Sequence, residues 1–130
     1  MSPLFNADFL QGFVGTDLVA LSQDMNKNIR CAAVNAMANI GKLFSIDFVV
    51  QKFYPELRKL SMDRWEVRLA IVENIDELSY LMPEEIRSTQ FSIFMVKFIE
   101  DETRWVKEAA LGGLGRFLTT LTKENMPEKL

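Results

Sequence analysis

The sequence predicts an all-α protein, an α-α superhelix of about three antiparallel helical hairpins. One stretch of sequence recurs three times, with 39 positions from Asp24 to Asp63 and 38 more to Asp101. Within each copy, apolar residues follow the three-to-four spacing of a helical face. No sustained alternation of apolar and polar residues indicates a strand. A single hairpin cannot bury both of its faces, so we expect the copies to stack against one another.

The repeat combines an aspartate with an aliphatic–basic pair and an alanine. Its matching positions are Leu21-Ser22-Gln23-Asp24 with Leu60-Ser61-Met62-Asp63 and Phe98-Ile99-Glu100-Asp101, the basic residues Arg30, Arg68 and Lys107, and the alanines Ala32, Ala70 and Ala109. These matches divide one domain, 1–130, into repeats at about 8–44, 45–82 and 83–121. Neither end has an obviously polar outer face, so we expect the chain to be part of a longer solenoid; the alternatives are ends covered by partners or self-association through an exposed end.

Each copy is expected to hold two helices, of which the second shows the clearer pattern. The predicted core faces of the second helices are Ile29, Ala32, Ala33, Ala36, Met37, Ile40 and Leu43, then Val67, Ala70, Ile71, Ile75, Leu78 and Leu81, then Val106, Ala109, Ala110, Leu114, Phe117 and Leu121. The first helices carry larger side chains: Phe9, Phe13, Val14, Leu18 and Leu21, then Phe53, Leu57 and Leu60, then Phe91, Phe94, Met95 and Phe98.

Helix boundaries and breaks agree with this division. Ser45 is expected to cap a helix, and Pro83-Glu84-Glu85 is typical of a helix start. Pro55 lies inside a first helix and is expected to bend it. Asp24, Asp63 and Asp101 fall in the short turns, where each could cap the following helix. Gly112, Gly113 and Gly115 either allow close helix approach or weaken the last helix.

Composition argues against catalysis and against several classes of ligand. The 130 residues include no histidine and one cysteine, Cys31, which excludes an ordinary zinc site and the commonest general base. Cys31 is interpreted as a small buried apolar residue. No catalytic, cofactor-binding or metal-binding residue is therefore predicted. The net charge of −3 disfavours nucleic acid as a partner, and no apolar run is long enough to span a membrane. We expect an intracellular, cytoplasmic protein, with a nuclear location also consistent.

The recurring basic residues are expected to pair with the recurring aspartates, Arg30, Arg68 and Lys107 forming a ladder between neighbouring turns. Two tryptophans, Trp65 and Trp105, are expected to lie in these turns, each preceded by an arginine. Tryptophan and arginine are enriched among residues that anchor protein interfaces. The alternative is that each indole covers its own helix pair. Trp65 is the better binding candidate, because Trp105 is displaced by one position relative to its basic residue.

These residues resemble a known family. The aspartate, aliphatic–basic and alanine pattern, with a proline in a first helix, is similar to HEAT repeats over about residues 8–121. The second copy, Tyr54-Pro55-Glu56-Leu57 and then 63–73, looks like the repeats of the scaffold (A) subunit of protein phosphatase 2A, and the related regulatory subunit of protein phosphatase 4 is similar. Lys27 and Arg104 stand where the other two copies would have the tryptophan.

The resemblance implies a non-catalytic scaffold that holds other proteins, namely a phosphatase catalytic subunit or a substrate-selecting subunit. Its expected protein-binding residues are Trp65, Arg64, Met62, Trp105 and Arg104. The main alternative is a HEAT adaptor for another protein assembly or a transport complex. A HEAT-like enzyme would need His–Glu metal ligands or a basic groove for DNA, and the sequence offers neither.

Overall fold

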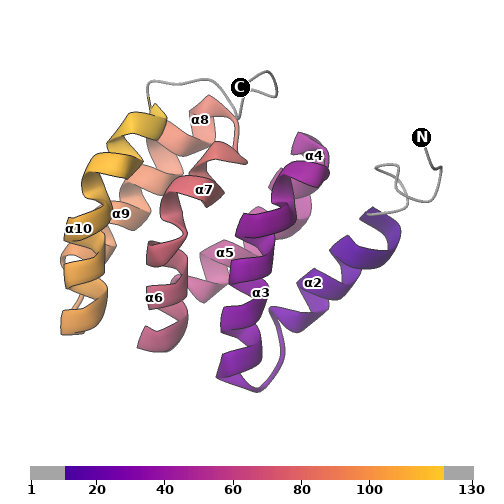
Figure 1. Ribbon diagram of the computed structural model, residues 1–130, viewed down its shortest axis with the longest axis horizontal. Helices are drawn as coiled ribbons and strands as arrows, with labels where there is room; N and C mark the ends of the chain where they lie inside the picture. The colour runs from indigo at the N-terminus through magenta and orange to yellow at the C-terminus, as the bar shows by residue number, and fades with distance from the viewer. Residues whose placement is uncertain (1–10, 122–130) are drawn as a thin grey trace.

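The computed structural model describes residues 11–121, and every regular element in that range is helical (Figure 1). The predicted all-α class is confirmed for these residues. Phe9 and the start of the first predicted repeat, 8–10, lie outside the described residues, as does 122–130.

The helices follow one another as three pairs. In the first pair, the first helix comprises a π-helical turn, η2 (Gln11–Gly15), and α2 (Thr16–Leu21), and the second comprises α3 (Lys27–Ile40) and η3 (Gly41–Leu43). In the second pair, α4 (Ile46–Phe48), η4 (Val49–Phe53) and α5 (Tyr54–Leu60) run on into α6 (Trp65–Glu73) and α7 (Ile75–Tyr80). The third pair contains α8 (Glu84–Ile86), η5 (Arg87–Phe91), α9 (Ser92–Ile99) and α10 (Arg104–Leu121).

The pairs lie side by side in two layers (Figure 1). The second helices α3, α6–α7 and α10 form the layer nearer the viewer, with α5 and α9 behind them. In the near layer α6 packs against both α3 and α10, and α10 also packs against α9 across the layers. The three turns that join first to second helices lie at the same end of the molecule, which places their side chains along one edge (Figure 1).

The core follows the predicted pattern most closely in the second pair. All six predicted residues of its second helix are buried, as are Phe53, Leu57 and Leu60 of its first helix. The first pair departs from the prediction: Phe13 and Leu21 are exposed, whereas Val34 and Ala38 of α3 are buried without having been predicted. The two pairs differ in how many neighbours cover them. In the first pair α2 packs mainly on α3, whereas in the second pair α6 is covered by α3 and α10 and also contacts α9.

Each first helix contains a π-helical turn, although only one of these helices contains a proline. The π-helical turn Val49–Phe53 ends two residues before Pro55. Proline has no amide hydrogen to donate within a helix, and a π-helical turn accommodates its ring. The turns at Gln11–Gly15 and Arg87–Phe91 contain no proline and are followed by none in their helices, although Pro83 caps the helix that contains Arg87–Phe91. The irregularity is therefore a feature of all three first helices rather than an effect of Pro55.

Close helix approach, one of the two interpretations of the glycines in α10, is wrong for Gly112 and Gly115. A methyl group on Gly112 or Gly115 would meet nothing within 4 Å, so no helix approaches α10 closely there. The close approaches occur instead between the first and second pairs. A methyl group on Gly15 would overlap the Phe48 ring, and one on Gly41 would overlap the Leu81 side chain.

Candidate protein-binding edge

The turn aspartates order the turns themselves. Oδ1 of Asp24 accepts a hydrogen bond from the Asn26 amide at 2.8 Å, and Oδ1 of Asp101 accepts one from the Thr103 amide at 2.8 Å. Asp63 does the same for the Arg64 amide at 2.6 Å. The expectation that the aspartates occupy the cap position was wrong for α3, which Asn26 caps by accepting from the Asn28 amide, and for α6, whose cap residue is Arg64. Ser45, by contrast, caps α4 as predicted, accepting from the Phe48 amide.

The predicted ladder of basic residues and aspartates is confirmed at the first junction between pairs. The Arg30 guanidinium donates to Oδ1 of Asp63 in the next turn at 2.8 Å. It also donates to the main-chain oxygens of Asp24 and Met25 in its own turn, at 2.9 and 3.1 Å. One guanidinium therefore ties two successive turns together.

The same contact recurs at the second junction with better geometry. Arg68 donates to both carboxylate oxygens of Asp101, at 2.8 and 3.0 Å, and to the Thr103 hydroxyl at 3.2 Å. It also donates to the main-chain oxygen of Asp63 in its own turn. Burial raises the pKa of Asp101, but the hydrogen bonds from Arg68 and Thr103 outweigh it and hold that pKa below its ordinary value. Lys107 occupies the corresponding position of α10 and is exposed.

A second row of contacts runs along the first turns of the second helices. Trp65 begins α6, and its ring stacks on Trp105, the second residue of α10, with centroids 5.0 Å apart and planes at 26°. At the preceding junction, Lys27 begins α3 and forms an ion pair with Glu66, the second residue of α6. At both junctions the first residue of one second helix meets the second residue of the next second helix. Trp105 contacts Trp65 because it stands at the second position of α10 and not at the first.

This arrangement differs from the alternative in which each indole covers its own helix pair. Each indole lies at the start of a helix rather than in the turn, and the two cover each other across a junction. Trp65 is half-buried and also packs against the core, whereas Trp105 is 60% exposed. The ring with more free surface is thus the one that the sequence favoured less.

The candidate residues lie on one edge, which we call the turn edge and define as Met25, Met62, Arg64, Trp65, Arg104 and Trp105. Met62 is 76% exposed and Met25 is 96% exposed, so large apolar side chains project into solvent at two of the three turns. The Arg104 guanidinium bonds Glu108 at 2.9 Å, and that contact raises the pKa of Arg104. Arg64 lies 3.5 Å from Glu66. Both arginines remain largely exposed.

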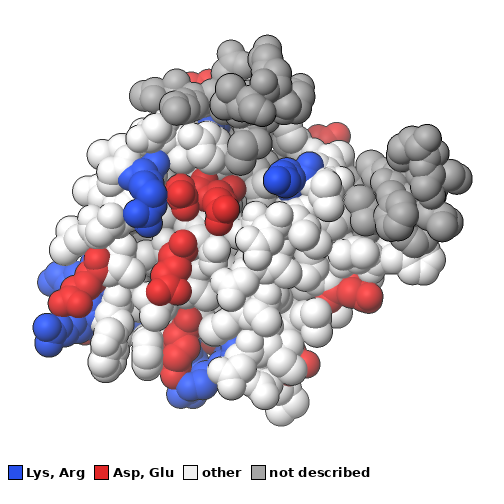
Figure 2. Space-filling model, viewed as in Figure 1, with Lys and Arg blue, Asp and Glu red and all other residues white. Residues whose placement is uncertain are grey.

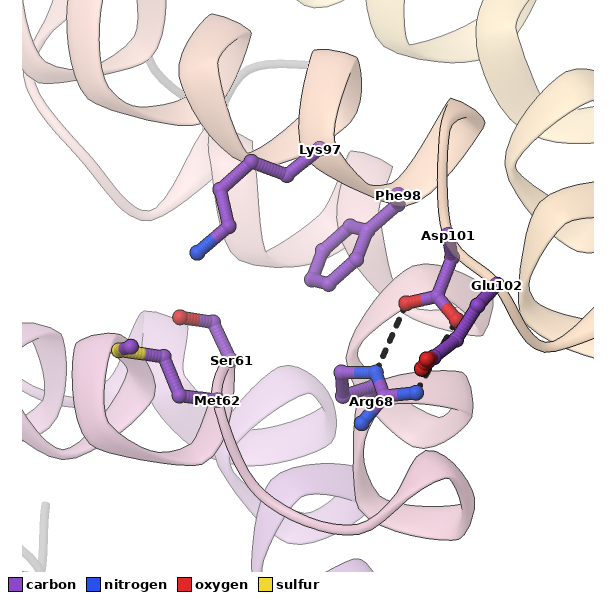
Figure 3. Close-up of a pocket in the computed structure, with 7 residues that line it drawn as sticks. All are labelled: Ser61, Met62, Arg68, Lys97, Phe98, Asp101 and Glu102. Carbon is purple, nitrogen blue, oxygen red and sulfur yellow. Dashed lines mark hydrogen bonds and ion pairs between the residues drawn. The ribbon is translucent and has the colours of Figure 1, made fainter.

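A hollow opens beside the turn edge between the second and third pairs (Figure 3). In Figure 3, Lys97 extends from α9 toward Ser61 and Met62 on the opposite wall, and Phe98 lines the interior. Arg68 and Asp101 close one side through their hydrogen bonds, with Glu102 next to them. Sequence reasoning missed Lys97 and Met25, because neither lies at a position that repeats in all three copies.

Two kinds of reactive group bear on whether the described residues carry out chemistry, metal ligands and a nucleophilic cysteine. Residues 11–121 contain no group of three or more His, Cys, Asp or Glu side chains arranged to hold a metal ion. Burial raises the pKa of the Cys31 thiol, as does the nearby Glu66 carboxylate, so the sulfur is a poor nucleophile. Cys31 is only partly buried, contrary to prediction, and lies 3.5 Å from the main-chain oxygen of Glu66. Within the same range, no helix has both the length and the apolar character needed to cross a bilayer.

Comparison with known proteins gives a partial match. Over 56 residues the chain is 39% identical to the serine/threonine-protein phosphatase 4 regulatory subunit 1 of Homo sapiens, and the proteins of that name from Mus musculus and Rattus norvegicus match to the same extent. The match covers 43% of this chain and 6% of the length of each relative. No protein-family model matches the chain. The similarity is thus to a regulatory subunit rather than a catalytic one, over less than half of the chain.

Proposed function

We propose that this chain is a non-catalytic scaffold segment of the HEAT type, repeated at about 8–44, 45–82 and 83–121, that binds a subunit of a serine/threonine protein phosphatase complex of the 2A/4 class. The partner would be the catalytic subunit or a substrate-selecting subunit, bound at the turn edge. The partial similarity to a phosphatase 4 regulatory subunit supports this class of partner.

The observation that carries the proposal is the stack of Trp65 on the exposed Trp105 at the turn edge, which also presents the exposed Met62. Two indole rings held at 5.0 Å present a rigid apolar surface, so a partner can bury them without first ordering them. Arg64 and Arg104 precede the two tryptophans in the chain, and their largely exposed guanidinium groups provide donors at the margin. Buried aromatic anchors with a polar margin are typical of the residues that dominate binding energy at protein interfaces.

The test is affinity capture from cell lysate with the tagged full chain and a Trp65→Ala/Trp105→Ala variant. A matched control is Leu111→Ala/Leu118→Ala, which truncates two exposed apolar residues of α10 away from the turns. We expect the wild type and the control to retain a phosphatase catalytic subunit, identified by mass spectrometry. The tryptophan variant should retain at least about tenfold less. Circular dichroism confirms that all three proteins are folded.

Other outcomes separate the parts of the proposal. If a different set of proteins is captured and is lost from the tryptophan variant, the turn edge is the binding site and the adaptor function replaces the phosphatase one. If a phosphatase subunit binds all three proteins equally, the partner stands and the turn edge is the wrong site. Absence of any phosphatase subunit on the wild type contradicts the assignment of partner.

A further inference from the structure

A second surface, in the layer of first helices, forms a groove between α5 and α9. Its basic lining residues are Arg58 and Lys59 on the α5 side and Lys97 on the α9 side. Its apolar lining includes Ile93 and Phe94 of α9, with Met62 at the end nearest the turns. This surface belongs to the opposite layer from the face made by α3, α6–α7 and α10.

The charge of the groove is opposite to that of the chain. The net charge is −3, yet every charged residue that lines the groove is basic. Residues 11–121 form no ion pair with Lys97. Lys59 pairs only loosely with Glu56, at 3.5 Å, and Glu56 already accepts hydrogen bonds from Ser22 and Gln23. The basic side chains therefore retain most of their capacity to bind an added carboxylate.

The groove also offers apolar contact that the folded chain leaves unused. Phe94 is buried, but Ile93 is 54% exposed beside it. Met62 is flexible and largely exposed, which suits a side chain that adapts to a bound apolar residue. An occupant with both acidic and apolar residues would satisfy both properties of the groove.

The two ends of the groove differ in charge. Met62 and Lys97 also line the hollow of Figure 3, so the groove and the hollow are continuous. At the hollow, Asp101 is neutralised by Arg68, whereas Glu102 is exposed and adds negative charge. Acidic residues of an occupant would therefore lie toward Arg58 and Lys59, in the last turn of α5, rather than toward Glu102.

The opposite layer has the opposite character. Figure 2 shows acidic side chains gathered over α6 and α7 on the face nearer the viewer. Glu73 and Glu77 are exposed there, together with the partly exposed Asp76. An acidic segment would be repelled from this face and attracted to the groove, which makes the two layers electrostatically distinct.

We propose that the groove between α5 and α9 binds an acidic segment of a partner protein, with at least one large apolar side chain seated against Ile93, Phe94 and Met62. The proposal goes beyond the phosphatase-binding function, because its basic residues and Ile93 lie outside the turn edge. Protein is favoured over nucleic acid, since three cations on an acidic chain form no extended basic face. It is favoured over a membrane, since the apolar residues line a groove.

The test starts with a displayed library of random dodecapeptides selected on the full-length chain at low salt. Enriched peptides are synthesised with a fluorophore, and their affinities are measured by anisotropy. The variants are Arg58→Glu/Lys97→Glu, which reverses the groove charge, and Ile93→Ser, which removes the apolar seat. Lys42→Glu/Lys107→Glu is the matched control, because both lysines are exposed and the change in net charge is identical.

We expect enriched peptides to combine Asp or Glu with a large apolar residue and to bind more weakly as salt is raised. Arg58→Glu/Lys97→Glu and Ile93→Ser should each weaken them at least about tenfold, while the lysine control leaves affinity unchanged. The proposal is overturned if no peptide is enriched, if the enriched peptides are not acidic, or if they bind the charge-reversed variant equally. Self-association in sedimentation velocity that Arg58→Glu/Lys97→Glu abolishes would identify a second copy as the occupant and would also overturn it.

Discussion

The two junctions between neighbouring helical pairs use the same positions with different chemistry. The first and second positions of successive second helices meet as the ion pair Lys27–Glu66 at one junction and as the stack Trp65–Trp105 at the other. The arginine–aspartate contacts of the adjacent row have the same chemistry at both junctions. The fold therefore decides which positions meet, and the local sequence decides what they do.

The difference makes the second junction the better candidate for binding a partner. An ion pair at the surface satisfies its own charges and contributes little to an approaching protein. A stacked pair of indoles leaves apolar surface facing solvent at a fixed geometry, with 60% of Trp105 exposed. The same backbone arrangement thus mainly fixes the register of neighbouring helices at the first junction, and it presents a candidate binding surface at the second.

Removal of Arg68 gives the largest expected effect. Arg68→Ala leaves the Asp101 carboxylate, whose side chain is 8% exposed, without its bidentate partner. We expect a loss of about 2–3 kcal/mol in the free energy of unfolding, measured by urea denaturation. Arg30→Ala should cost less, about 1–2 kcal/mol, because Asp63 is more exposed and can be rehydrated.

Arg104→Ala is the matched control for these two substitutions. Its guanidinium is largely exposed and pairs within its own helix, so no resolvable change in stability is expected. Equal losses for Arg30→Ala and Arg68→Ala would contradict the idea that the second junction has the stronger arginine contact.

Two glycine substitutions test the difference in packing between the first junction and α10. Gly41→Ala forces a methyl group against Leu81, and we expect a destabilisation of about 1–2 kcal/mol. Gly112→Ala faces open space in a helix and should stabilise the protein by about 0.5–1 kcal/mol. Opposite signs in thermal unfolding confirm that close approach occurs at Gly41 and not at Gly112.

The helical architecture was predictable because it depends on periodic apolar residues. The second pair was predicted best, since its helices are covered on both sides and apolar character alone identifies Val67, Ala70 and Ile71. Phe13 and Leu21 have the same apolar character but remain exposed. Sequence periodicity identifies an apolar face, whereas burial also requires a neighbour to cover it.

Most residues of the turn edge were predictable from the sequence, but Met25 was not, and neither were the contacts between the residues. The ladder followed from two recurring residue types, so Arg68 and Asp101 could be paired from spacing. The stack of Trp65 on Trp105 could not, because the sequence aligns Trp65 with Arg104. The pairing became visible only when the structure showed that the first position of one helix meets the second position of the next.

The stack itself is tested by a double-mutant cycle on Trp65→Ala and Trp105→Ala. We expect a coupling of about 0.5–1.5 kcal/mol in the free energy of unfolding, which is the range for aromatic pairs beyond their area of burial. This coupling should be insensitive to salt. A coupling near zero would mean that the rings are close without stabilising the junction, and each indole would then act independently in binding.

Titration of Glu66 gives the smallest expected effect and tests the ion pair at the first junction. The hydrogen bond from Lys27 lowers the pKa of Glu66, with a further contribution from a main-chain amide, and both outweigh the opposing effect of burial. Because the pKa is lower in the folded chain than in the unfolded one, the stabilisation is present above the ordinary pKa of about 4.3. It is lost as the pH falls through the folded value.

Carboxyl-carbon NMR can follow this titration directly. We expect Lys27→Ala to return the pKa of Glu66 toward its ordinary value and Trp105→Ala to leave that pKa unchanged. If Lys27→Ala leaves the pKa of Glu66 unchanged, the ion pair does not stabilise the first junction. Acid also weakens the second junction, since the pKa of Asp101 is lowered in the folded chain. Added salt distinguishes these two contacts more clearly than pH does. It screens the Lys27–Glu66 ion pair and leaves the stack of Trp65 on Trp105 intact.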